Sequence, residues 1–427
     1  MDESLLVPPA EIYDSGTGPE SETDQPARSS RHTLCAMRFD LQWRSQHACH
    51  TDSQVSQKLN LWRDIFPPQL EEGILDQPVG HTASADFQVG ELIEPYRPND
   101  SFEIKSDQFN RRFRKGNYVE PRAGRFYPKG FIASVRGIFP EDATPFRVTR
   151  SDESLGVDLN HPLAGSEMRL SATLMNIRQA GEEHGGFCHD IAELATLGGP
   201  GMQARWQGQP SDFWSDLPFA RMAGEADAYF YQMPRMVDHI DSVADSQIEA
   251  LYGRLIPPGA EVLDLMSSWK SHLPESLSLA AVSGLGMNLE ELEANTRLGE
   301  RVVHDLNLQP QLPFEDNRFD AIVCTVSVEY LIKPLEVFAE AARVLKPGGR
   351  FILTFSNRWF QPKVIKIWQD LHEFERMGLV LEYLLKSGGF RDLETWSLRG
   401  MLRPRDDKYA GQLPFADPVY AVWAEKA

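Results

Sequence analysis

The chain has few cysteines, a deficit of basic residues and no long hydrophobic run. Its 427 residues include four cysteines, none in a CxxC pair, so we expect a reducing compartment rather than a disulfide framework. The 43 basic residues face 62 acidic ones, a formal net charge of −19, which argues against nucleic acid or an anionic membrane as partner. No apolar run approaches the roughly 20 residues that span a bilayer. We therefore expect a cytoplasmic protein, and no His/Cys group has the paired spacing of a metal site.

The length allows two globular units plus tails. Residues 1–60 are low in hydrophobicity and show no sustained period, which predicts a mostly disordered N-terminal tail. Short apolar runs separated by Gly, Pro and Asp predict a β-rich unit over 84–178. A connector rich in Gly, His and Gln follows over 179–216, and 217–427 alternates strand and helix.

The alternation in the second half predicts an α/β fold with a Rossmann-like parallel sheet, crossover helices and an antiparallel last strand. Apolar spacing predicts a helix over 236–256. Asn288, with Glu291 three residues later, has the pattern of a helix N-cap. The expected strands are 261–266, 278–287, 302–307, 319–328, 350–356, 390–398 and 418–426.

The turn after the first of these strands lacks glycine. A nucleotide-binding fold would continue from Asp264 into a glycine-rich loop, but Ser267, Ser268 and Trp269 stand there instead. Glycines in such loops permit positive φ and a close approach of backbone to ligand. Two interpretations follow: the loop is degenerate and only packs, or it is a rebuilt binding site.

Three motifs carry a resemblance to a known family: VLDL at 262–265, LPFEDNRFDAIVC at 312–324 and RVLKPGGRFILTF at 343–355. With these, the stretch from about 235 to 427 resembles class I S-adenosylmethionine-dependent methyltransferases. The resemblance implies a seven-stranded sheet, S-adenosylmethionine as cofactor, and methyl transfer to a small-molecule or protein nucleophile. The alternative is a non-catalytic binding or chaperone protein built on a degenerate scaffold.

The resemblance also assigns residues to the cofactor. Gly286 stands where the second strand usually ends in the acid that binds the ribose, which leaves Met287 to cover the adenine and Asn288 to bind the ribose or only to cap the helix. Asp305 and Leu306 match the place of the adenine contacts. The full expected set is Asp264, Met266, Ser267, Ser268, Trp269, Met287, Asn288, Asp305 and Leu306.

Glu329 and Tyr330 follow the fourth strand, at the sheet edge where open α/β folds bind ligands. Either is a candidate general base or orienting group; a surface acid and a packed aromatic are the alternatives. Arg235 and His239 are four residues apart, so a helix would put them on one face beside the cleft. Together with Asn357 after the fifth strand, we expect them to contact substrate, with plain helix-surface charges as the alternative for the first two.

A second resemblance lies within 84–178. The segments GRFYPKGFIASVRGIFPEDATPFRV and GVDLNHPLAGSEMRLSATLMNIR are similar to the later half of an FKBP-type peptidyl-prolyl isomerase. That similarity implies an unfolded or proline-containing peptide as partner. Leu170 stands where the last strand of those enzymes supplies a phenylalanine, so we expect a substrate-holding or structural domain rather than an isomerase.

Overall fold

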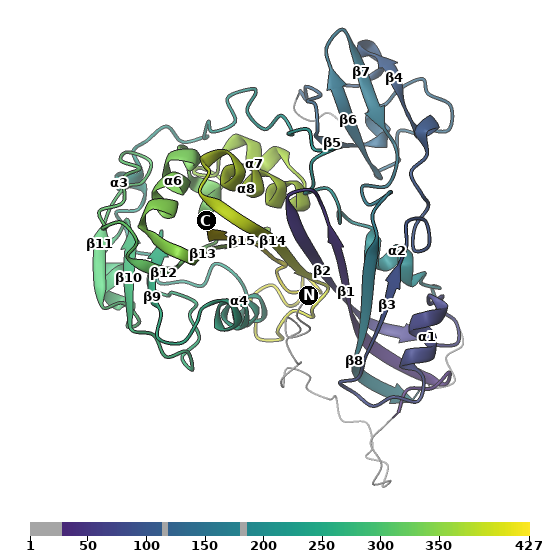
Figure 1. The fold of residues 1–427 in the computed structure, drawn as a ribbon, viewed down its shortest axis with the longest axis horizontal. Coiled ribbons are helices and arrows are strands. Elements are labelled where there is room, and N and C mark those ends of the chain that lie inside the picture. The colour runs from purple at the N-terminus through teal and green to yellow at the C-terminus, as the bar shows by residue number, and fades with distance from the viewer. Residues whose placement is uncertain (1–27, 113–117, 180–185) are drawn as a thin grey trace.

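The computed structural model describes residues 28–112, 118–179 and 186–427. Its largest feature is a sheet of eleven strands in the order β11-β10-β9-β12-β13-β15-β14-β2-β1-β8-β3. A separate sheet of four strands, β4-β7-β6-β5, stands above the end of the large sheet that carries β1 and β8 (Figure 1).

The elements have the following bounds. The large sheet contains β1 (Thr33–Arg44), β2 (Ala48–Asn60), β3 (Thr82–Phe87), β8 (Met168–Gln179), β9 (Glu261–Leu265), β10 (Ala281–Gly286), β11 (Glu300–Val303), β12 (Phe319–Thr325), β13 (Leu345–Phe355), β14 (Phe390–Arg399) and β15 (Val419–Lys426). The small sheet contains β4 (Ser101–Lys105), β5 (Phe126–Pro128), β6 (Pro145–Ser151) and β7 (Ser154–Asp158). The α-helices are α1 (Pro68–Ile74), α2 (Ile191–Thr196), α3 (Asp227–Phe230), α4 (Ser242–Leu255), α5 (Leu289–Ala294), α6 (Pro334–Val344), α7 (Lys366–Asp370) and α8 (Glu373–Ser387). Short 3₁₀ turns are η2 (Pro98–Asp100), η3 (Ser106–Gln108), η5 (Lys129–Phe131) and η6 (Val328–Tyr330).

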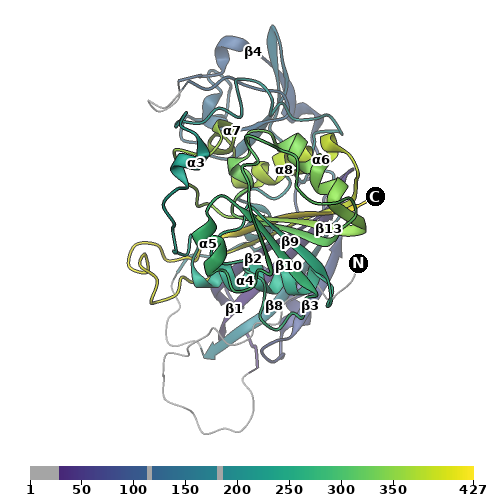
Figure 2. The same ribbon diagram turned by 90° about the vertical axis from the view of Figure 1, so that its left-hand side faces the viewer.

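The seven strands expected in the second half each coincide with an observed strand. From β11 to β13 neighbouring strands are parallel, and β15 pairs antiparallel with both β13 and β14. The apolar runs of β9, β12 and β13 are buried on both faces, because α6 and α8 cover one face and α4 covers the other (Figure 2). The expected number of strands in this sheet, seven, was nevertheless wrong, since the sheet continues beyond β14 through β2, β1, β8 and β3.

The expected disorder over 1–60 is wrong for its second half. Residues 1–27 lie outside the described residues, but β1 and β2 form a long antiparallel hairpin, and β2 pairs in parallel with β14. Buried polar contacts hold this seam: Asp52 accepts hydrogen bonds from Ser397 and Arg399, and His50 bonds to Thr395. The low hydrophobicity of this segment reflects polar groups that find partners more than 300 residues away.

The expected β-rich unit over 84–178 is divided in the structure. Its first and last strands, β3 and β8, pair with each other and join the large sheet beside β1. The strands between them, β4 to β7, form the small sheet with its own aromatic core. In the connector over 179–216, the described part contains α2 and irregular chain.

The helix expected over 236–256 begins only at Ser242. Asp241 ends the irregular chain by accepting hydrogen bonds from the N–H groups of Val243 and Ala244, as an N-cap does. Arg235 and His239 therefore do not share a helix face. None of the described helices is long and apolar enough to cross a membrane.

The buried seam yields a stability prediction. Replacing Asp52 by alanine leaves the Arg399 guanidinium, which donates to it at 2.5 and 3.2 Å, without its acid. Removing one partner of a buried ion pair costs about 3–5 kcal/mol, so we expect that loss in the urea-unfolding free energy of Asp52→Ala. The control is Asp86→Ala, which breaks an exposed cross-strand pair with Arg169 and should cost below about 1 kcal/mol. Equal losses in the two variants would contradict this account of the seam.

Candidate active site

A pocket opens at the carboxyl ends of the parallel strands β9, β10 and β12. The space between its walls is about 1100 Å³, a figure that includes open solvent at its mouth. In open α/β sheets this edge is where ligands bind. The lining side chains come from 227–239, 264–272, 285–291, 304–307 and 325–330, with Phe360.

The loop after β9 is fixed by its two serine hydroxyls. Ser267 donates to the Asp264 carboxylate at 2.6 Å, and its main-chain N–H donates to the Leu285 carbonyl at 2.8 Å. Ser268 donates to the Glu291 carboxylate at 2.6 Å. The turn that lacks glycine is therefore tied to strand β10 and to α5, and it is not a loose connection.

Trp269 does not fill the pocket. Its indole N–H donates to the Val237 carbonyl at 3.1 Å, so the ring is held against the segment that leads into α4. Space remains among Ser268, Met287 and Asp305, all of which line the same cavity. The bulk that replaces the glycines therefore leaves the cavity open.

Three residues of the lining have a positive φ, and two of them directly follow a strand; the third is His272, with φ +54°. Met266 has φ +60° and Val326 has φ +41°, both in the left-handed region that non-glycine residues rarely adopt. They follow β9 and β12, so the strain lies where these two adjacent strands end at the pocket. Such conformations cost about 1–3 kcal/mol each and concentrate at functional sites.

The end of β10 explains the absence of an acid at Gly286. A Cβ atom at this position would lie 2.2 Å from the Ser267 carbonyl oxygen, so a side chain there would collide with the rebuilt loop. Asn288 is used as the N-cap: its Oδ1 accepts from the N–H of Glu290 and Glu291, and its Nδ2 donates to the carbonyls of 231 and 232. Asn288 is outside the pocket lining. The structure therefore places it as an N-cap and does not place it for the expected ribose contact.

Two acids of the expected cofactor set, Asp264 and Asp305, line the pocket. Burial raises the pKa of Asp264 to about 6, against the opposing effect of its bonds from Ser267 and Ser271. Asp305 follows β11 and is half-buried, and its Oδ1 accepts from the N–H of Asn307 at 2.9 Å. Leu306, Met287 and Met266, the other expected apolar contacts, also line the pocket.

The candidate catalytic pair is split by the turn after β12. Tyr330 lines the pocket, and its ring stacks on that of Phe360 with the ring centres 6.0 Å apart. Its hydroxyl oxygen accepts a hydrogen bond from the Phe360 N–H at 2.8 Å. Glu329 points the other way: it is 1 % exposed, lies outside the pocket lining, and burial raises its pKa to about 8. The expectation that Glu329 acts on the rim is therefore wrong, because the 3₁₀ turn η6 directs it into the core.

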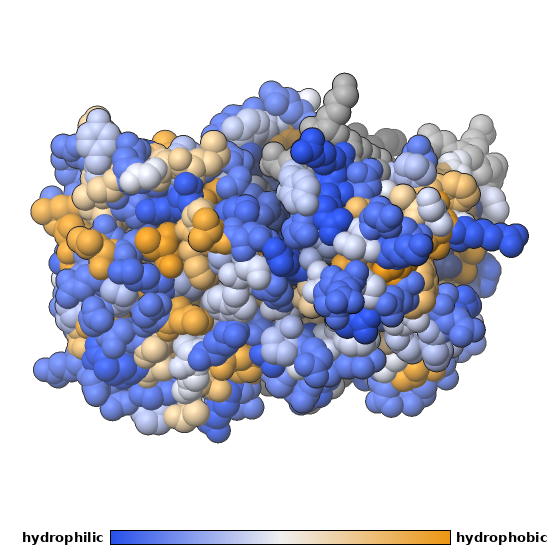
Figure 3. Space-filling view, turned by 90° about the horizontal axis from the view of Figure 1, so that it is seen from above, coloured by the Kyte–Doolittle hydropathy of each residue, from blue (hydrophilic) through white to orange (hydrophobic). Residues whose placement is uncertain are grey.

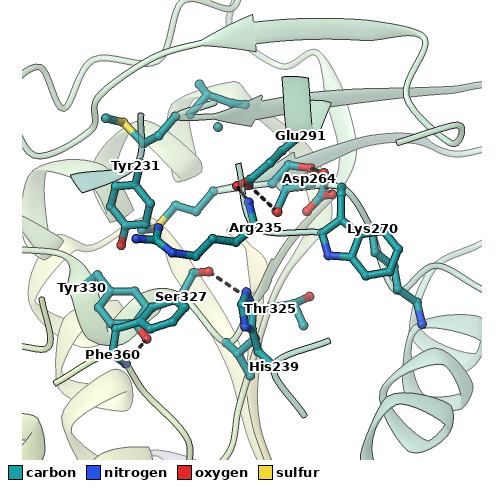
Figure 4. A pocket seen from close by; sticks show the side chains of 18 of the residues that line it. Tyr231, Arg235, His239, Asp264, Lys270, Glu291, Thr325, Ser327, Tyr330 and Phe360 are labelled. Carbon is teal, nitrogen blue, oxygen red and sulfur yellow. Dashed lines mark hydrogen bonds between the residues drawn. The ribbon is translucent and has the colours of Figure 1, made fainter. Parts of the chain in front are cut away.

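The segment 217–239, which we call the cap, closes one side of the pocket. Figure 4 shows the Arg235 side chain extending between Tyr231 and the stacked pair Tyr330 and Phe360. His239 also lines the pocket, and burial lowers its pKa. Both residues reach the site from irregular chain rather than from a helix. Asn357, the third expected substrate contact, is exposed and lies outside the lining.

A buried ionic cluster anchors the cap, and it could not be found from the sequence. Asp227 pairs with Arg221 at 2.9 Å and with the fully buried Lys363 at 3.0 Å. Asn307 donates to the same carboxylate at 2.8 Å and also to the Tyr330 carbonyl. The cluster thereby ties the cap to the loops after β11, β12 and β13.

Glu291 is a further site residue, expected only as part of a capping box. Its Oε1 accepts the Arg235 N–H at 2.7 Å while Oε2 holds Ser268. One buried carboxylate of α5 therefore joins the cap to the loop after β9.

The raised pKa of Asp264 yields a pH prediction. Between its unfolded value of 3.8 and about 6, the folded chain binds more protons than the unfolded chain, so this group's contribution to stability falls as pH rises. Asp264→Asn should therefore gain stability relative to wild type from about pH 4.5 to 7.5, on the order of 2 kcal/mol in urea unfolding. Asp320→Asn is a control of opposite sign. Burial raises the pKa of Asp320, but the bonds that it accepts from the Glu261 N–H and Lys346 outweigh burial, so the net pKa is lowered. If the stability difference between Asp264→Asn and wild type did not change with pH over this range, the pKa of the Asp264 carboxyl would not be raised in the folded chain.

Comparison with known proteins points to one kind of domain. Residues 271–353 match the family model described as "Methyltransferase domain". The ubiquinone/menaquinone biosynthesis C-methyltransferase UbiE of Bartonella quintana is 31% identical over 158 residues, which cover 37% of this chain and 53% of that protein. The UbiE protein of Brucella canis is 41% identical over 91 residues, 21% of this chain and 29% of that protein.

Among solved structures, an S-adenosylmethionine-dependent methyltransferase from Mesorhizobium loti has 15% identity and a TM-score of 0.29, covering 43% of this chain and all of that one. The chain spans about half the length, or less, of the curated relatives it matches. The family match and the two curated relatives, with the strand order around the pocket, identify a class I S-adenosylmethionine-dependent methyltransferase domain in the C-terminal half of the chain.

Proposed function

We propose that this chain transfers the methyl group of S-adenosylmethionine to a small-molecule or protein nucleophile. The observation that carries the proposal is the state of the loop after β9. A degenerate loop would be expected to collapse into the cavity, but this one keeps a strained Met266 and ties Ser267 and Ser268 to buried carboxylates around open space. Strain and buried polar bonds of this kind are retained where a ligand site requires them.

The chain's own residues fit the cofactor. Asp264 and Asp305 supply acids for its ammonium and its adenine amino group, and Met287 supplies an apolar surface. The main-chain N–H groups of Ser268 and Trp269 donate to no described residue, so they are available to the cofactor carboxylate. When bound, the cofactor supplies a methyl group on a positively charged sulfur.

The acceptor side of the pocket has groups for orientation and proton removal. The Tyr330 hydroxyl already accepts the Phe360 N–H, so its own proton is free to donate to an acceptor. Burial raises the pKa of Tyr330 well above its usual value, which favours this donor role over that of a base. His239, whose pKa burial lowers, is neutral near pH 7 and is our candidate to accept the proton that the nucleophile loses.

The cofactor prediction is direct. Titration of the full chain with S-adenosylhomocysteine should show binding, and Asp305→Ala should weaken it about tenfold or more, since a hydrogen bond to a charged group contributes about 1.5–3 kcal/mol. Glu290→Ala, on the neighbouring helix but outside the pocket lining, should bind as wild type does. Absence of binding up to millimolar concentration would refute the proposal. Mass spectrometry of the purified protein would identify a retained cofactor independently.

We also propose that the N-terminal unit keeps the FKBP-like architecture and holds an unfolded or proline-containing peptide. What supports this is the antiparallel order β2-β1-β8-β3 with α1 packed in its core, and a second cavity at the junction with the connector. Leu170 is buried in the core and contributes no aromatic wall, so we assign holding rather than isomerisation. The aromatic residues of the second cavity are Trp43, Tyr96, Phe126 and Trp206.

This second proposal predicts peptide binding by the intact chain. A fluorescent proline-containing peptide should show an increase in anisotropy, and Tyr96→Ala should weaken binding about tenfold because a buried aromatic contact is lost. Phe139→Ala removes an aromatic that is 66 % exposed and lies outside the lining of this cavity, and it should have no effect. The proposal fails if the wild-type chain shows no binding up to about 1 mM peptide.

A further inference from the structure

Charged groups line both sides of the methyltransferase pocket, and they differ in whether an opposite charge of the protein already pairs with them. Asp264, Glu291 and Asp305 lie on the side formed by β9, β10 and β11. The side formed by the cap and the end of β12 carries Arg235 and His239 with hydroxyl groups, and its two acids, Asp227 and Asp238, are paired with Lys363 and Lys270. The paired acids of the cap leave Arg235 as the charge that this side offers to a ligand.

Arg235 is a fixed cation without an acid. Its guanidinium lies 4.4 Å from the Phe230 ring centre and 5.5 Å from that of Phe360, and one of its nitrogens donates to the Phe230 carbonyl at 3.1 Å. Its main-chain N–H is held by Glu291, so the residue is positioned at both ends. Among the described residues no carboxylate forms an ion pair with this side chain.

The other basic side chains of the lining differ in this respect. Lys270 pairs with Asp245 of α4, so its charge is already offset, and His272 bonds to the same carboxylate. Arg235 is the sole arginine among the described residues that line the pocket. A guanidinium fork that is pre-ordered by aromatic rings and lacks a protein acid is suited to a bidentate oxyanion.

The cofactor carboxylate is the competing occupant of this site. That group has other donors on the loop after β9, where the N–H groups of Ser268, Trp269 and Lys270 donate to no described residue. In Figure 4, Arg235 reaches instead towards Tyr231, Tyr330 and Phe360, on the side of the pocket away from Asp264. Arg235 is therefore assigned to the acceptor.

We propose that Arg235 binds an oxyanion of the methyl acceptor, a carboxylate or a phosphate, so that the acceptor is an anionic small molecule or an anionic group of a larger one. The inference rests on the proposed methyl transfer and names its substrate class. The cap around this subsite carries exposed apolar side chains, and Figure 3 shows hydrophobic groups gathered at the end of the molecule that bears α3 and β11. The exposed apolar side chains of the cap are Leu217, Met222, Tyr229, Met233, Met236 and Val237. An apolar body next to the anion therefore fits the surroundings.

The test uses the full chain saturated with S-adenosylhomocysteine and three probes of similar shape. Fluorine NMR titration should give 4-fluorobenzoate or 4-fluorophenyl phosphate a dissociation constant at least about tenfold below that of neutral 4-fluorobenzamide. The relative strength of the two anions identifies carboxylate or phosphate as the favoured source. Arg235→Met keeps the aliphatic stem and should abolish the preference for anions, while Arg405→Met, at an exposed arginine outside the lining, should keep it.

Separate outcomes distinguish the two proposals. Arg235→Met should bind S-adenosylhomocysteine within about threefold of wild type, which also shows that the variant folds. A loss of more than about tenfold would place Arg235 on the cofactor and overturn the assignment to the acceptor. Equal binding of anionic and neutral probes by wild type would also overturn it, while leaving methyl transfer intact. Failure of wild type to bind S-adenosylhomocysteine would overturn both proposals.

Discussion

The turn after β9 has to leave its strand without a glycine, and the rest of the site depends on how it does so. Met266 takes a positive φ, and the Ser267 carbonyl approaches β10 so closely that only Gly286 fits opposite it. The strain costs about 1–3 kcal/mol. Hydrogen bonds to charged groups contribute about 1.5–3 kcal/mol each, and the turn has two, to Asp264 and Glu291. The serines therefore offset the strain and hold the turn as an open frame.

Where the sequence predicted the fold well, a strong local pattern was present. Strands such as β9 and β12 are continuous apolar runs between turn residues, and both are almost wholly buried. β1 and β2 were missed because their core positions include polar groups such as Asp40, His50 and Asp52. Those groups are satisfied by partners on β2 or β14. No local pattern reveals a partner that is hundreds of residues away.

The candidate site shows the same division. Asp264, Ser267 and Asp305 were predicted correctly as neighbours because parallel strands end at one edge of the sheet, and all three line the pocket. Side-chain direction in a turn was not predictable. The inward Glu329 and the pocket-lining Tyr330 are consecutive residues, and only the 3₁₀ geometry of η6 decides which of them faces the pocket. Glu291 and Lys363 act across the tertiary structure, and their sequence neighbours give no indication of it.

Asp264 differs from the other buried acids near the pocket in its partners. Unlike Asp227 and Asp245, which are paired with cations, Asp264 has hydroxyl partners, and burial raises its pKa to about 6. A buried carboxylate without a cation is attracted to any positive charge brought nearby, by about 4 kcal/mol at 4 Å for an effective dielectric near 20. Asp264 therefore has two roles in the site: it holds the turn through Ser267, and it offers an unpaired negative charge for the ammonium that we propose it binds.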